Sequence, residues 1–206
     1  MSPNEIEQQL RSVYSEWYGL LVNPRFCRHN NLISWTAYDG GKAREPVTNE
    51  KFLNLVETRQ YSFQCAEDGS LFQLLYRFDN SLHLTEARLG FYRTADPGVS
   101  EQAALVSWLR FDFDPQFSSG VLHHDCHLHI HGFPDTRIMV DGVPSPRQFV
   151  DFVLASCYPS SFEILRINED GRYAGIEGAT EEDLKTIQVG RIPRPSHLIH
   201  IGLTLP

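Results

Sequence analysis

The chain has 206 residues, of which 41% are hydrophobic and 21% are charged, and its formal net charge is −8. This composition predicts an ordinary globular protein, and no run approaches the eighteen or so apolar residues of a membrane span. The acidic balance argues against a general nucleic-acid coat, because nonspecific affinity comes from neutralising phosphates. The four cysteines (Cys27, Cys65, Cys126 and Cys157) include no CxxC pair, which favours reduced thiols and a cytoplasmic location.

The first part of the chain is predicted to be mainly helical. The Ser-Pro-Asn-Glu run at residues 2–5 is a capping box with proline at the first helical position, and apolar residues then recur at helical spacing. We therefore expect an amphipathic helix over roughly residues 3–22. Residues 32–41 are typical of a strand that runs into a turn, and a shorter helix is expected to begin near Thr48.

From residue 60 onward the periodicity changes from helical to alternating. Six segments of alternating character are separated by short turns, which predicts an antiparallel meander. The expected strands cover residues 61–66, 71–79, 84–93, 104–114, 126–131 and 136–140.

The last part of the chain begins with a second capping pattern, Ser-Pro-Arg-Gln, which predicts a helix over residues 145–158 that ends before Pro159. We expect a short helix over residues 181–189 and a closing strand over residues 197–205. These elements together predict one α+β domain over residues 1–206, with an antiparallel sheet of five to six strands and helices packed on one of its faces. Its parts are a mainly helical region (1–58), the sheet (60–140), the helix (145–158) and a C-terminal segment (160–206).

Side-chain parity divides the predicted sheet into two unlike faces. Successive side chains of a strand point to opposite sides, so Leu128 and Ile130 are expected on one face and the histidines between them on the other. The apolar set forms the core, and its burial fixes the register. We expect the opposite face to be a concave or open polar surface. It gathers His127, His129, His131, Asp112, Asp114, Arg77 and Arg110.

A metal site is one interpretation of this polar surface. Residues two apart on a strand lie about 6.6 Å apart at Cα, which lets two imidazoles reach one ion. Zinc takes three histidines, or two histidines and a carboxylate, and leaves a position for water in catalytic sites. His127, His129 and His131 are therefore candidate ligands of a divalent ion such as zinc or manganese, with Asp112 or Asp114 as the carboxylate.

A second interpretation needs no metal, because histidine titrates near neutral pH and arginine stabilises charge on a phosphoryl group. His129, oriented by an aspartate, would then cleave RNA by general acid–base catalysis, with a phosphate held by Arg77, Arg110 or Arg137. In a third interpretation the face is an ordinary polar sheet surface, or a surface that binds another protein.

Six segments also keep a distinctive order and spacing: LFQLLYRFD, ARLGFYR, WLRFDFDP, HLHIHG, DTRIMV and SPRQFVDFVLASCYP. In these segments, over roughly residues 50–160, the chain resembles a bacterial family catalogued only as a domain of unknown function. The resemblance implies a small cytoplasmic protein from mobile or defence-associated gene neighbourhoods. A weaker similarity to TumE-like toxins rests on YRFDN at residues 76–80 and the later histidines, and it favours RNA or phosphodiester chemistry.

These patterns together predict a small cytoplasmic nuclease or phosphodiesterase that acts as a toxin or defence effector. The substrate would be a nucleic acid or a nucleotide, and a protein encoded in the same operon is an expected partner. The alternative is a non-catalytic binding subunit of a bacterial defence complex. In the enzyme hypothesis the catalytic groups are His127, His129, His131, Asp112 and Asp114, and the substrate-binding groups are Arg77, Arg110 and Arg137.

Overall fold

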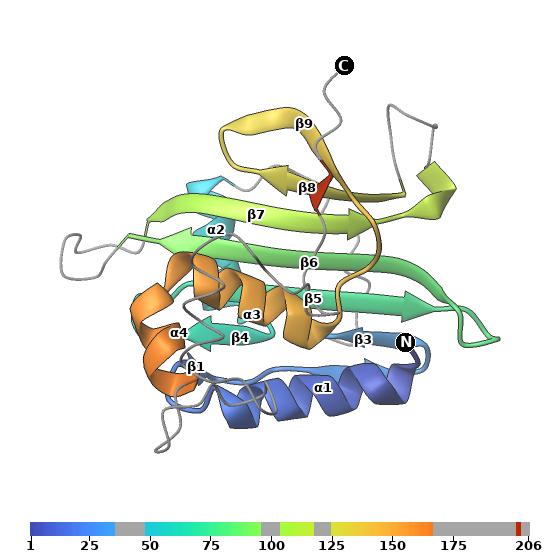
Figure 1. The fold of residues 1–206 in the computed structure, drawn as a ribbon, viewed down its shortest axis with the longest axis horizontal. Helices are drawn as coiled ribbons and strands as arrows, with labels where there is room; N and C mark the ends of the chain where they lie inside the picture. The colour runs from blue at the N-terminus through green and yellow to red at the C-terminus, as the bar shows by residue number, and fades with distance from the viewer. Residues whose placement is uncertain (36–47, 96–103, 118–124, 167–200, 203–206) are drawn as a thin grey trace, which may run out of the picture. The chain divides into compact units, whose positions relative to one another are not determined.

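The computed structural model describes residues 1–35, 48–95, 104–117, 125–166 and 201–202 (Figure 1). The chain divides into two compact units, one of residues 1–147 with 200–206 and the other of residues 148–199. The second unit contains nearly all of helix α3 (Pro146–Cys157) and helix α4 (Pro159–Arg166). The α+β class is confirmed, whereas the single domain over the whole chain stays a prediction.

A ten-stranded sheet with antiparallel pairing forms the frame of the first unit. Its strands are β1 (Leu21–Val22), β2 (Cys27–His29), β3 (Leu32–Ser34), β4 (Phe63–Cys65), β5 (Leu71–Phe78), β6 (Leu84–Thr94), β7 (Leu105–Phe113), β8 (Cys126–Ile130), β9 (Phe133–Val140) and β10 (Ile201–Gly202). Strands β4 to β9 are neighbours in sequence order, so the predicted meander is confirmed. The sheet is larger than predicted, because β1 pairs with β4 and β2 pairs with β3. Strands β1 and β2 are too short to show a periodicity in the sequence.

Helix α1 (Pro3–Glu16) begins at the predicted capping box and ends earlier than expected, because the chain beyond it forms β1. It packs against one face of the sheet. The ring of Tyr14 stacks on that of Phe63, with 6.2 Å between centroids, and Phe63 lies directly opposite Phe72 of β5. Phe72 in turn contacts Phe91 of β6, with centroids 4.9 Å apart. This aromatic row is the core predicted from strand parity.

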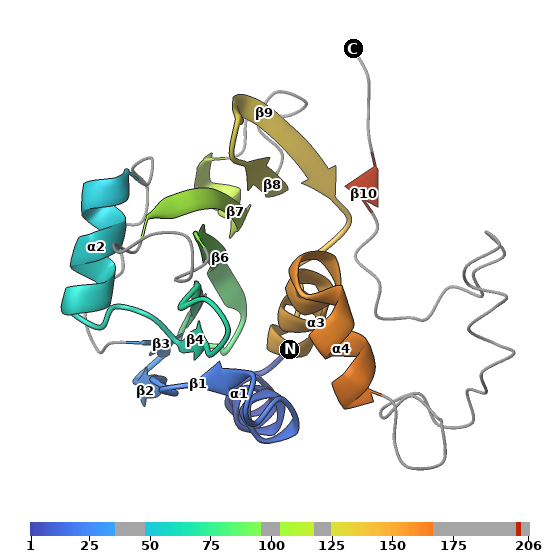
Figure 2. The ribbon, with the colours of Figure 1, turned by 90° about the vertical axis from the view of Figure 1, so that its left-hand side faces the viewer.

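Helix α2 (Asn49–Glu57) begins at its N-cap Thr48, as predicted. Its buried Phe52 packs with Leu71 and Tyr92, which are paired across β5 and β6. Leu71 is the strand neighbour of Phe72 and therefore points to the opposite face. Figure 2 shows α2 on one side of these strands, away from α1. The helices of the first unit thus cover both faces of the sheet, whereas the sequence predicted helices on one face.

The C-terminal predictions are only partly covered by the described residues. Helix α3 ends at Cys157, one residue before the predicted end, and Pro159 then begins α4. Of the predicted closing strand, β10 is described and pairs with β9. The predicted helix over residues 181–189 lies outside the described residues. No helix in the described part of the chain combines the length and the apolar character that a membrane span requires.

Candidate functional site

Strands β5 to β8 carry the two faces that parity predicted. Residues directly opposite each other in an antiparallel pair share a face, so the strand pairing identifies each set. The apolar face comprises Phe72, Leu74, Tyr76, Ala87, Leu89, Phe91, Leu109, Phe111 and Leu128. The polar face comprises Gln73, Arg77, Glu86, Arg88, Arg110, Asp112, His127 and His129.

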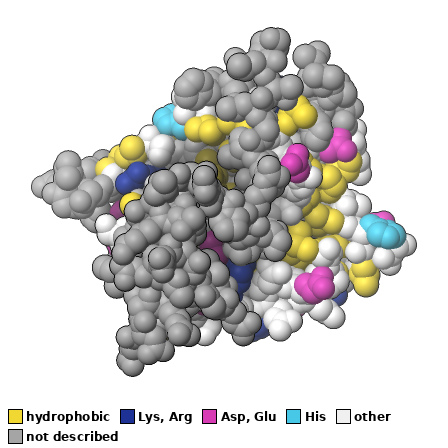
Figure 3. All heavy atoms as spheres, in the orientation of Figure 1, with side chains coloured by type: hydrophobic (Ala, Val, Ile, Leu, Met, Phe, Trp, Pro, Cys, Tyr) yellow, Lys and Arg dark blue, Asp and Glu magenta, His cyan; other side chains and the backbone are white. Residues whose placement is uncertain are grey.

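The polar face is buried rather than open, which differs from the prediction. His127 is 2% exposed and His129 is 8% exposed, and Arg88 is also buried. The histidines visible on the described surface in Figure 3 are isolated from one another. The apolar residues Leu71 and Tyr92 share this face with the polar ones, and α2 packs on them. Buried polar groups of this kind need hydrogen-bond partners, because an unpaired one costs about 1–3 kcal/mol.

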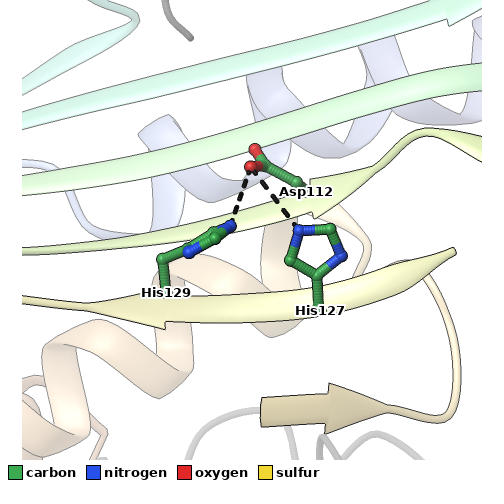
Figure 4. A group of neighbouring side chains, drawn as sticks. All are labelled: Asp112, His127 and His129. Atoms are coloured by element: carbon green, nitrogen blue, oxygen red, sulfur yellow. Dashed lines mark ion pairs between the residues drawn. The ribbon is translucent and has the colours of Figure 1, made fainter. Parts of the chain in front are cut away.

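Asp112, His127 and His129 form one group in which each residue offers a ligand atom within 4.8 Å of the others. We call them the Asp112 cluster. The Nε2 atom of His129 lies 3.4 Å from Oδ2 of Asp112, and the Nε2 atom of His127 lies 4.0 Å from the same oxygen. The two rings meet edge to face, with centroids 4.8 Å apart. Figure 4 shows both imidazoles turned toward the carboxylate across β7 and β8.

Arg110 holds the carboxylate of this cluster in place. Its Nε donates to both carboxylate oxygens of Asp112 at 3.0 Å, and its Nη2 donates to Oδ2 at 2.7 Å. Burial alone would raise the pKa of Asp112, but the hydrogen bond from His129 and the charge of Arg110 outweigh it and lower the pKa to about 2. Asp112 is therefore ionised at neutral pH.

The other residues proposed from the sequence lie outside the Asp112 cluster. Arg77 pairs with Glu86, with Nε 2.9 Å from the carboxylate. Asp114 follows β7, and its Oδ2 lies 3.8 Å from Nη2 of Arg88. Arg137 is exposed on β9. Of the three arginines predicted to hold a phosphate, Arg77 and Arg110 thus pair with carboxylates of the same face.

His131 is not brought to the other two histidines. Strand β8 ends at Ile130, and His131 is exposed in the turn that follows, where Gly132 has a φ of +88°. Its ring lies against Trp108, with 6.0 Å between centroids. The predicted set of three histidines is therefore replaced by two histidines and one aspartate. The pairing of β8 with β9 shifts register between Leu128 and Ile130, and sequence alternation alone does not show this shift.

The chain matches the family described as "Uncharacterized conserved protein (DUF2290)" over residues 22–174, which is well over half of its length. The chain belongs to the DUF2290 family. The predicted resemblance to a family of unknown function is thereby confirmed, and the match includes the whole Asp112 cluster. No curated protein and no solved structure matches the chain significantly. The similarity to TumE-like toxins stays a prediction.

Two further residues of this DUF2290 member belong to the neighbourhood of the cluster and were not selected from the sequence. Arg88 lies directly opposite Asp112 in the β6–β7 pairing, and its Nη2 is 2.5 Å from Glu86. Tyr92 is buried, and it lies close enough to Arg110 and Asp112 that both charges affect the pKa of its hydroxyl group. Both residues have the parity of the polar face, so parity was the signal that could have identified them.

The Asp112 cluster supplies an ionised carboxylate and two imidazoles in a largely dry environment. A histidine hydrogen-bonded to an aspartate is oriented for proton transfer, and this pairing recurs in hydrolytic sites. Two histidines with one carboxylate also form the ligand set of many divalent-metal sites. In either role Arg110 is a positioning residue, because it donates hydrogen bonds to both oxygens of the carboxylate.

Proposed function

We propose that this DUF2290 member is a cytoplasmic hydrolase of phosphodiester bonds, a nuclease or phosphodiesterase that acts as a toxin or defence effector. Its catalytic centre is the Asp112 cluster, where a water molecule is activated for attack on phosphorus. The observation that carries the proposal is the convergence of two buried imidazoles on one ionised carboxylate oxygen. Structural ion pairs do not require a second imidazole there, whereas hydrolysis requires groups that activate water.

Phosphodiester substrates are favoured by the arginines of the polar face. Arg88 lies opposite Asp112, and its buried Nη1 has no hydrogen-bond partner among the residues that the structure describes. This atom retains the capacity to donate to a phosphate oxygen, and exposed Arg137 is a second candidate for that role. Arg110 and Arg77 instead orient Asp112 and Glu86.

The test is hydrolysis by the purified full chain of single-stranded RNA, single- and double-stranded DNA, and bis-(p-nitrophenyl) phosphate. We expect cleavage of at least one substrate, and a loss of about 10²-fold or more in kcat/KM in His129→Ala and Asp112→Asn. His131→Ala is the matched control, because His131 lies outside the cluster, and it should keep the wild-type rate. If His129→Ala and Asp112→Asn fold normally and cleave as fast as the wild type, the proposal fails.

A non-catalytic subunit of a bacterial defence complex is the second candidate. It is favoured by the burial of the cluster and by the pairing of Arg77 and Arg110 with carboxylates of the same sheet. Size-exclusion chromatography of the chain co-expressed with its genomic neighbours distinguishes the two. A stoichiometric complex in which no component cleaves any substrate favours the subunit, and activity of the isolated chain favours the enzyme.

A further inference from the structure

We infer that Asp112, His127 and His129 bind one divalent transition-metal ion of the zinc, cobalt or manganese class. The ligand set differs from the three histidines that the sequence suggested, because the structure brings a carboxylate to the place of His131. A catalytic role for this ion rests on the proposed function, whereas the binding of the ion to the three residues does not. No other group of three metal-ligating side chains is this close together within the described part of the chain.

The separations of the donor atoms suit a single ion. Ligands at about 2.1 Å from a tetrahedral metal lie about 3.4 Å from one another. The His129–Asp112 separation is already 3.4 Å, and the His127–Asp112 separation is 4.0 Å. The three ligand atoms all lie within 4.8 Å of one another, so the His127 ring has to turn toward the other two residues for all three to reach one ion. His127 lies directly opposite Asp112 in the β7–β8 pairing, which places the two side chains on the same face of the sheet.

The two rings reach the same carboxylate oxygen at different distances. At 4.0 Å the contact between His127 and Asp112 is too long for a hydrogen bond. Arg110 already donates twice to the same Oδ2. A cation between the two Nε2 atoms and Oδ2 would be held by both rings and the carboxylate at once.

The donor set also selects the metal. Two of its three donors are imidazole nitrogens, which suit zinc, cobalt and related ions, whereas magnesium and calcium prefer oxygen donors. Arg110 supplies the supporting interaction that metal-binding carboxylates commonly have. Three protein ligands leave a position for water, and a bound ion of this class supplies an activated water and stabilises negative charge.

The test is titration of the chelator-stripped full chain with Zn²⁺ by calorimetry and with Co²⁺ by visible absorption. We expect one equivalent to bind, with affinity lowered at least about 10–100-fold in His127→Ala, His129→Ala and Asp112→Asn. His131→Ala should bind as the wild type does, and an excess of Mg²⁺ or Ca²⁺ should not compete. The inference is wrong if the wild type binds no ion, or if His131→Ala weakens binding as much as His127→Ala.

A measurement on the wild type alone keeps the test decisive if a cluster variant fails to fold. In imidazole ¹H–¹⁵N spectra, Zn²⁺ should shift the signals of two histidines, His127 and His129, and leave His131 in place. A shift confined to other histidines would overturn the inference. Metal binding without hydrolysis would contradict only the proposed function, whereas hydrolysis by a protein that binds no metal in the titration would contradict only the metal site.

Discussion

At the residue scale, the polar face depends on Asp112, whose carboxylate is the acceptor for Arg110 and for His129. Because these partners lower its pKa to about 2, the folded carboxyl binds a proton less readily than the unfolded one. The sign of the linkage is therefore that the interaction stabilises the fold above about pH 4 and is lost as the pH falls toward 2.

We expect this loss to reach about 1 kcal/mol at pH 3 and about 2 kcal/mol below pH 2. Urea unfolding of metal-free protein at pH 7 and pH 3 measures it. Asp112→Asn should show a correspondingly smaller decrease, whereas Asp141→Asn, at an exposed aspartate, should behave as the wild type. Equal pH dependence in wild type and Asp112→Asn would contradict the assigned ion pair.

Gly90 leaves the space that the Tyr92 ring occupies. A Cβ at Gly90 would lie 2.7 Å from Oη of Tyr92 and 3.0 Å from two ring carbons. We therefore expect Gly90→Ala to lower the free energy of unfolding by about 1–3 kcal/mol. Adding Tyr92→Phe, which removes the closest atom, should recover part of the loss.

The matched control is Gly142→Ala, where an added Cβ meets nothing within 4 Å. It should change the unfolding midpoint little or raise it slightly. If Gly90→Ala and Gly142→Ala have the same unfolding midpoint, Tyr92 does not lie over Gly90.

At the element scale, helix α2 is attached to the polar face of the sheet through Phe52. Phe52→Ala should lower the free energy of unfolding by about 3–5 kcal/mol, because it leaves a cavity between the helix and the Leu71–Tyr92 pair. Asn54→Ala, on the exposed side of the same helix, should change it by less than about 0.5 kcal/mol. Guanidinium unfolding measures both, and similar values for the two variants would show that α2 is not packed there.

The elements differ in how far their sequence predicts them. The capping box of α1 and the strands from β4 to β9 were predictable, because each carries several periods of its own pattern. The residues of strand β1 fall within the predicted first helix, because Leu21 also fits a helical spacing. The position of α2 was not predictable, because an amphipathic helix does not specify which face of a sheet it covers.

At the scale of the whole molecule, parity predicted that histidines of β8 would lie on the same face as Asp112 of β7, and the β7–β8 pairing confirms it. Parity did not predict that this face would be buried, since burial depends on α2 and on apolar residues such as Tyr92 within the polar set. Parity also placed His131 in line with the other two histidines. The end of a strand is set by its pairing with neighbouring strands, which the alternation of side chains does not show. His131 lies beyond that end.

The most direct measurement is an anomalous difference map from crystals of the full chain grown with Zn²⁺, with data from both sides of the zinc absorption edge. The predicted result is one peak about 2.0–2.2 Å from His127 Nε2, His129 Nε2 and an Asp112 carboxylate oxygen. A peak coordinated by His131, or a clear map with no peak between β7 and β8, would contradict the assignment of the Asp112 cluster as a metal centre.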